Sequence, residues 1–266
     1  MNVPILYALP LFALGFAVIA VAAHSVLRLF LSPERLSEHH EVAGFLMGVV
    51  GVLYSVVLGL LVGTVWTGFA SAQQNSDLEA GYVADAFNYA GQVQYSGRRE
   101  ELQALIARYA VDVRNTAWSE AQRRQDPTAM LLYRAVRLTV TMPAPARSTT
   151  AVTLLEGNTI QDSLLQTLRS LADARRLRAV QSESRLPPGM LEALVLGAIA
   201  VISFTFFFGV RNYFKQMAMT ALLAGSIGLF FGLILELSSP YSGAVQVSRD
   251  AWTFVIESNH LAEFAR

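Results

Sequence analysis

The run from Val42 to Phe69 constrains this chain more than any other part of the sequence, because it contains no charged residue. About 20 apolar residues in a helix cross the hydrocarbon of a bilayer, so this run can span a membrane even when tilted. Its glycines recur at spacings typical of one helix face, where small residues allow close approach of a neighbouring helix. The pattern predicts a membrane helix that either packs among its neighbours or lines a pore or a seam in an oligomer.

The composition supports the same class of protein. Hydrophobic residues make up 53% of the 266 residues and charged residues only 15%. A soluble domain usually carries about 25% charged residues, so the deficit indicates an integral membrane protein. The 20 basic and 20 acidic residues balance, which leaves no net-charge argument for a nucleic-acid partner. The chain has no cysteine, which excludes disulfides, thiolate metal sites and cysteine catalysis.

Three further apolar segments are long enough to span a membrane, namely Ile5–Leu31, Met190–Phe208 and Met217–Leu237. The motif SSPYSG follows the last of them and is expected to end it. Near the end of the first segment, His24 and Ser25 are expected to lie at the membrane interface. The sequence therefore predicts an all-α integral membrane protein with four transmembrane helices.

The chain between the second and third spans is polar and shows helical periodicity. It has no proline from Ala70 to Gln125, so the second span should continue as a long helix, with a break near Gly91 to Gly97. Beyond the break, apolar residues recur at helical spacing, namely Leu102, Leu105, Ile106, Tyr109 and Val113. We therefore expect a helical bundle inserted between the second and third spans. The predicted organisation is transmembrane helices 1 and 2 in residues 1–69, the extramembrane bundle in 70–186, transmembrane helices 3 and 4 in 187–237, and an interfacial tail in 238–266.

The candidate functional residues lie in the spans, because no catalytic triad, phosphate loop or spaced histidine cluster is present in the sequence. Neither an enzyme, a cofactor nor a metal site is predicted. The pore-lining candidates are the small and polar residues of the second span, namely Gly44, Gly48, Gly51, Tyr54, Ser55, Gly59, Gly63 and Thr64. Glu192 and Glu236 are acidic candidates for a pore mouth, where carboxylates attract cations; alternatively each lies at the headgroups or caps its helix. Asp173 is expected to form surface ion pairs with the arginines at 175, 176 and 178.

Several stretches of the chain resemble the bacterial bestrophin-like domain family of membrane proteins. The matching motifs are EVAGFLMGVVGVLYSVVLGLLVGTVW (residues 41–66), DARRLR (173–178), LPP before the third span and LELSSPYSG (235–243). The resemblance implies kinship with bestrophins, which are pentameric anion channels with four spans and a large helical excursion between the second and third. It also implies a multi-pass protein of the bacterial inner membrane. The calcium-clasp acidic cluster and the aromatic neck motif of bestrophins are not found in this sequence.

The charges of the short loops predict the orientation. Arg28, Arg35, Arg211 and Lys215 lie in or beside these loops, which places the loops in the cytoplasm and the bundle outside it. Bestrophins keep the corresponding excursion in the cytoplasm, so the resemblance implies the opposite orientation.

Two hypotheses for function follow from the sequence. The first is a homo-oligomeric ion channel or channel-like protein in the lipid bilayer, pentameric by resemblance, which passes inorganic ions. In it the second span lines the pore and the bundle forms a vestibule. The alternative is a non-conducting envelope protein whose bundle senses or scaffolds a partner.

Overall fold

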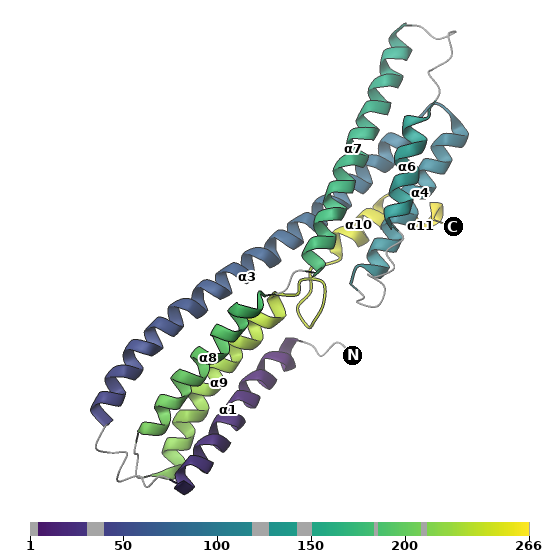
Figure 1. Ribbon diagram of the computed structural model, residues 1–266. Helices are drawn as coiled ribbons and strands as arrows, with labels where there is room; N and C mark the ends of the chain where they lie inside the picture. Colours follow the sequence, from purple (N-terminus) through teal and green to yellow (C-terminus); the bar gives the residue numbers. More distant parts are fainter. Residues whose placement is uncertain are drawn as a thin grey trace. The chain divides into compact units, whose positions relative to one another are not determined.

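The computed structural model describes residues 5–30, 40–118, 128–142, 151–183, 186–208 and 212–265. Every regular element within these ranges is helical (Figure 1), which confirms the predicted all-α class. In chain order the elements are α1 (Ile5–Phe30), α3 (His40–Gly91), α4 (Ser96–Thr116), α6 (Thr128–Val140), α7 (Ala151–Glu183), α8 (Pro188–Phe204), the 3-10 turn η1 (Thr205–Phe207), α9 (Tyr213–Leu237), α10 (Asp250–Ser258) and α11 (Leu261–Phe264).

Four stretches of the described chain are long and apolar enough to cross a membrane, as predicted, namely Tyr7–Phe30, Val42–Gly91, Thr159–Phe207 and Tyr213–Leu237. Helix α3 continues well beyond its apolar run and ends at Gly91, where the break was expected. Helix α8 begins at Pro188, two residues before the predicted start of the third span, because proline is tolerated in the first turn of a helix. The predicted loop charges Arg35 and Arg211 lie outside the described residues.

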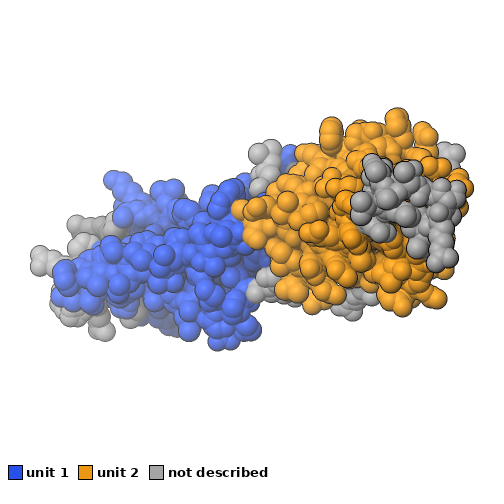
Figure 2. All heavy atoms as spheres, turned by 90° about the horizontal axis from the view of Figure 1, so that it is seen from above, with its two compact units in different colours: residues 1–69, 184–239, 243–245 blue, residues 70–183, 240–242, 246–266 orange. Residues whose placement is uncertain are grey.

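The chain divides into two compact units, coloured separately in Figure 2. Unit 1 comprises residues 1–69, 184–239 and 243–245, and unit 2 comprises residues 70–183, 240–242 and 246–266. The four apolar segments therefore contribute to unit 1. The polar region between the second and third spans falls in unit 2, together with most of the C-terminal tail.

In unit 1, helices α1 and α9 pack against each other through glycines of α9. A Cβ atom added to Gly228 would lie 2.7 Å from the carbonyl oxygen of Phe12 and equally close to the Cβ of Phe16. A Cβ added to Gly232 would lie 2.7 Å from the ring of Phe12. The absent side chains let the two helices approach to backbone contact, as small residues do in membrane helix pairs.

His24 of α1, expected near the membrane interface, has its side chain buried within the protein. Its Nδ1 lies 3.1 Å from the Oγ1 of Thr220 on α9, and its ring meets the edge of Phe206. A buried imidazole requires a hydrogen-bond partner, and the threonine hydroxyl of the facing helix supplies it.

The other contact layer of unit 1 joins α3 to α8 and α9. One face of α3 is buried, and its apolar side chains pack against those of α8 and α9. The buried residues of this cluster are Leu58, Leu61, Val65, Leu194, Ile234 and Leu237. Because these helices cover only one side of α3, the opposite side of its apolar run is left uncovered by the residues that the structure describes.

In unit 2, α4 packs against α6, α10 and α11, and α6 packs against α7. The apolar residues of α4 that recur at helical spacing are all buried, namely Leu102, Leu105, Ile106, Tyr109 and Val113. This confirms that the periodicity marks a core face. The tail joins the same core through Trp252 of α10, which is fully buried and donates its indole N–H to the Oγ of Ser76 at 3.0 Å.

Candidate functional site

The uncovered side of α3 in unit 1 is the first candidate site, and we call it the outer face. It consists of residues three or four apart along the helix, all of them exposed, namely Phe45, Gly48, Val52, Ser55, Gly59, Gly63 and Trp66. Residues with this spacing share one face of a helix. The outer face carries no charge, and its large side chains are well exposed, with Phe45 at 73% and Val52 at 62%.

The glycines of the outer face leave open space beside the helix. A Cβ added to Gly48, Gly59 or Gly63 would meet nothing within 4 Å. Among the described residues, these glycines therefore make no close helix contact.

Two of the candidates on α3, Ser55 and Thr64, donate their hydroxyl groups back to their own helix. Ser55 donates to the carbonyl of Val52 at 2.8 Å, and Thr64 donates to the carbonyl of Leu60 at 2.9 Å. Such bonds satisfy a hydroxyl in an apolar environment. Both side chains are exposed, so they remain available as second acceptors for water or an ion.

Three other pore-lining candidates from the sequence lie nearer to the neighbouring helices. Tyr54 packs its ring over Gly197 of α8, where an added Cβ would come within 2.5 Å of the ring, and its hydroxyl donates to the carbonyl of Leu194 at 3.2 Å. A Cβ on Gly44 would contact Phe208 at 3.8 Å. Gly51 is partly buried. The structure thus brings Gly48, Ser55, Gly59 and Gly63 together on the outer face and places Tyr54 inside the subunit.

Glu236, at the end of α9, makes local hydrogen bonds to the loop that follows it. Its Oε2 accepts the backbone N–H of Ala244 at 2.7 Å and that of Val245 at 3.4 Å. Gly243 turns the loop with a φ of +94°, and a Cβ there would lie 2.6 Å from the same oxygen. The carboxylate thus stabilises the turn. Glu192, the other acidic candidate, is exposed on α8.

Replacing Glu236 with alanine should therefore destabilise the protein without altering any ion selectivity. Hydrogen bonds to a charged group contribute about 1.5–3 kcal/mol, so we expect a clear fall in the thermal unfolding midpoint of detergent-solubilised protein. The Glu192→Ala variant is the control and should unfold as the wild type does. A Glu236→Ala variant of normal stability with a shifted reversal potential would contradict this assignment.

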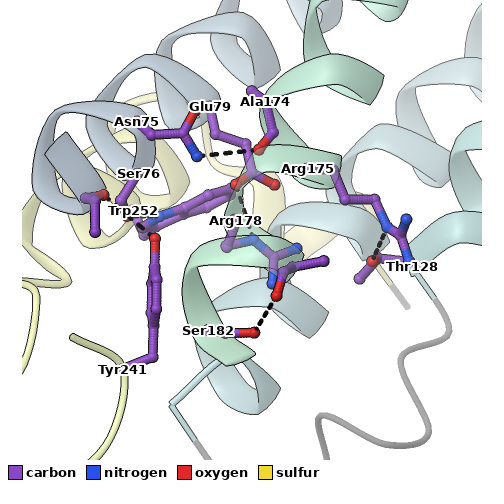
Figure 3. A network of polar contacts seen from close by, with 12 residues as sticks. Asn75, Ser76, Glu79, Thr128, Ala174, Arg175, Arg178, Ser182, Tyr241 and Trp252 are labelled. Carbon is purple, nitrogen blue, oxygen red and sulfur yellow. Dashed lines mark hydrogen bonds and ion pairs between the residues drawn. The ribbon is translucent and has the colours of Figure 1, made fainter. Parts of the chain in front are cut away.

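Unit 2 contains a second group of polar contacts, buried and centred on Glu79 of α3 (Figure 3). The Oε2 of Glu79 accepts the Nε–H of Arg178 from α7 at 2.8 Å, and its Oε1 accepts the hydroxyl of Tyr109 from α4. The side chains of Glu79 and Arg178 are 0% and 6% exposed. The contacts join α3, α4 and α7.

The electrostatics of this group favour a neutral tyrosine beside a charged pair. Burial raises the pKa of Tyr109 well above its usual value, and the negative charge of Glu79 raises it further, while Arg178 opposes the shift. Burial also raises the pKa of Tyr241, whose hydroxyl donates to the carbonyl of Ala72 at 3.3 Å. Both phenols therefore act as hydrogen-bond donors, and the contacts stabilise unit 2.

The surface ion pairs predicted for the arginines near Asp173 are found for one of the three. Arg176 pairs with Asp173 at 2.9 Å on an exposed surface. Arg175 donates to the hydroxyl of Thr128 at 2.9 Å, and Arg178 is the buried partner of Glu79. The prediction was wrong for Arg178, because its position along α7 turns it into the core. Among the residues that the structure describes, no group of three or more acidic or histidine side chains could hold a metal ion.

Comparison with known proteins identifies the family. A model of the Bestrophin-like domain matches residues 14–252, so the chain belongs to the Bestrophin-like domain family, as its motifs indicated. Among curated proteins, none matches the sequence.

Solved structures share the fold. A point-mutated bacterial bestrophin homologue from Klebsiella pneumoniae superposes with a TM-score of 0.60 at 14% sequence identity, over 98% of each chain. Another crystal structure of a bestrophin homologue from that organism gives a TM-score of 0.58 at 14% identity, again over 98% of each chain. The chain thus has a bestrophin-like fold along nearly its whole length.

Proposed function

We propose that this protein is a homo-oligomeric ion channel of the bacterial inner membrane. In this proposal the outer face of α3 lines the pore, and unit 2 forms a vestibule on the extracytoplasmic side, as the loop charges predict. Family membership supports a channel-like protein, because the bestrophins that the family resembles are oligomeric channels. The observation that carries the proposal is the outer face itself, which is continuous, uncharged and not covered by any described part of the chain.

The physical argument concerns what covers this face. A single subunit offers too few membrane helices to surround a pore, so conduction requires several copies. Small residues along a membrane helix favour close approach of a partner helix. A pore wall of glycines and apolar side chains, with the hydroxyl of Ser55 among them, is weakly polar, which suits ions that pass without tight binding.

Substituting the outer-face glycines tests the pore assignment. The Gly59→Leu and Gly63→Leu variants should each lower single-channel conductance by roughly half or more in planar bilayers, because a bulky side chain would narrow the pore wall. Gly68→Leu is the matched control: Gly68 is exposed on the same helix with nothing within 4 Å of an added Cβ. It lies five residues beyond Gly63 and so points to another side of α3.

Three results would contradict the proposal, in whole or in part. Purified wild-type protein that passes no ions in liposomes would favour a non-conducting scaffold. A molecular mass in detergent that corresponds to one subunit would remove the oligomeric pore. Equal conductance in the Gly59→Leu and Gly68→Leu variants would reject the outer face as the pore wall and leave the remaining topology intact.

A further inference from the structure

Unit 1 contains an apolar groove between α1 and α8, which we call the α1–α8 groove. It is a cavity of about 260 Å³, lined by residues of α1 from Phe16 to Ala23 and by residues of α8 and η1 from Val195 to Phe206. The lining residues recur at helical spacing, so the groove follows one face of each helix. Ser203 is the only one of them with a polar side chain.

The groove has a closed floor and an open mouth. Ala20 and Ala198 are only 4% and 2% exposed and form the floor, whereas Ile19 and Ile199 are 70% and 56% exposed and form the rims. Both α1 and α8 pack against α9, and the three helices run side by side in Figure 1. The groove therefore runs along the two helices and opens at the surface of unit 1.

The groove and the contact with α3 use different sides of α8. Tyr54 of α3 packs over Gly197 and donates its hydroxyl to the carbonyl of Leu194. Val195 and Ile199 line the groove instead. The outer face of α3, through which the proposed oligomer would form, does not include the groove.

The surroundings of the groove determine what can fill it. Helices α1 and α8 belong to two of the four apolar spans, so the groove opens into the hydrocarbon core of a bilayer. Water is excluded, because an apolar cavity of about 150 Å³ stays dry and yet admits benzene. An empty groove would deprive its lining of dispersion contacts. A hydrocarbon chain lying along the helices restores these contacts and leaves no polar group unpaired.

Positive charge lies beyond one end of the groove. Arg28 belongs to the last turn of α1, five residues or about 7.5 Å beyond Ala23. Its guanidinium donates to the side chain of Gln216 and lies 5.4 Å from the centroid of the Tyr213 ring. These contacts hold the charge at the end of the span, where basic side chains attract lipid headgroups.

We propose that the α1–α8 groove binds one acyl chain of a membrane phospholipid whose phosphate lies at the level of Arg28. The two parts of such a lipid match the two observations: the uncharged chain meets the apolar lining, and the phosphate meets a fixed positive charge. The site lies on a side of unit 1 that the proposed pore does not use. The inference therefore holds whether or not the protein conducts ions.

Native mass spectrometry of the full-length protein in detergent, with phosphatidylglycerol added, tests the proposal. Ala23→Phe fills the groove, and Ala22→Phe is the matched control, because Ala22 is the neighbouring exposed alanine and does not line it. The wild type and the control should bind one lipid per subunit at low lipid concentration. Ala23→Phe should bind it at least about tenfold more weakly, since a single methylene in an apolar pocket changes binding about 10–200-fold.

Two further measurements test the chain and the phosphate separately. Added phosphatidylglycerol should raise the unfolding midpoint of the wild type and of Ala22→Phe, and not that of Ala23→Phe, because a ligand stabilises only a fold that binds it. Diacylglycerol with the same acyl chains lacks the phosphate. It should bind the wild type about fivefold more weakly, the usual contribution of one basic residue near a membrane surface.

Three outcomes would count against the proposal. Equal lipid binding by Ala23→Phe and Ala22→Phe would refute the groove as the site. An Ala23→Phe variant that keeps its lipid but loses subunits from the oligomer would make the groove a contact between copies of the chain. Diacylglycerol bound as tightly as phosphatidylglycerol would refute the position of the phosphate. Each of these results would leave the channel proposal standing.

Discussion

Replacing Arg178 with alanine is expected to destabilise unit 2 by about 3–5 kcal/mol, the usual result of leaving one partner of a buried ion pair uncompensated. Glu79 would stay at 0% exposure without its guanidinium partner, and the hydroxyl of Tyr109 would remain as its hydrogen-bond donor. For a chain of this size, each kcal/mol lowers the unfolding midpoint by roughly 2–4 °C. Thermal unfolding in detergent, followed by circular dichroism, should therefore show a midpoint about 10 °C lower.

The control lies two residues earlier on the same helix. Arg176 forms an ion pair of nearly the same length with Asp173, but both side chains are more than 70% exposed. Exposed pairs contribute little, so Arg176→Ala should leave the midpoint nearly unchanged. The paired change Arg178→Met with Glu79→Gln removes both charges and should recover most of the lost stability. Equal midpoints for Arg178→Ala and Arg176→Ala would refute the structural importance of the buried pair.

Replacing Gly228 with alanine is expected to separate α1 from α9. The new methyl group would lie 2.7 Å from a backbone oxygen of Phe12, which cannot rotate away as the end of a side chain can. Overpacking of this kind costs about 1–3 kcal/mol, and we expect the upper end because two backbones must move apart. The unfolding midpoint of the detergent-solubilised protein should fall by several degrees.

Gly225 provides a graded comparison within the same helix pair. A Cβ on Gly225 would lie 3.4 Å from the carbonyl oxygen of Ala13, which is close to ordinary contact. Gly225→Ala should therefore be far better tolerated than Gly228→Ala. A reversed order of the two midpoints would mean that the packing of α1 on α9 differs from the one described.

Much of the fold could be predicted from the sequence, because the bilayer and the helix each impose a simple rule. Uninterrupted apolar runs identified the membrane segments, and the periodic residues of α4, such as Leu102 and Ile106, identified its core face. Both signals are local. Each can be read from one stretch of chain, because the bilayer or the protein core selects apolar residues along the whole of that stretch.

The candidate site was harder to predict, because it depends on which side of α3 the later helices cover. The sequence shows Tyr54 and Ser55 side by side, and nothing local distinguishes them. Only the positions of α8 and α9, formed by residues far along the chain, put Tyr54 against Gly197 and leave Ser55 exposed. Glu236 is a similar case, since its partners are backbone amides in a loop after the helix.

The buried ion pair between Glu79 and Arg178 could have been predicted by comparing charge with helical periodicity. Glu79 falls in register with the buried small residues of α3, three residues after Ser76 and four before Val83. Arg178 lies seven residues after the buried Leu171 of α7. Each charged residue thus stands where the periodicity calls for a core residue, and such a mismatch on two helices predicts that they pair.

The absence of lysine and arginine from α3 also determines how the protein responds to a protease. Trypsin cleaves after basic residues, and none occurs between Arg35 and Arg98. Complete digestion, even of fully unfolded protein, therefore releases the whole of α3 within one peptide, Leu36 to Arg98. Mass spectrometry of that single fragment would report every modification, label or cross-link placed along the helix.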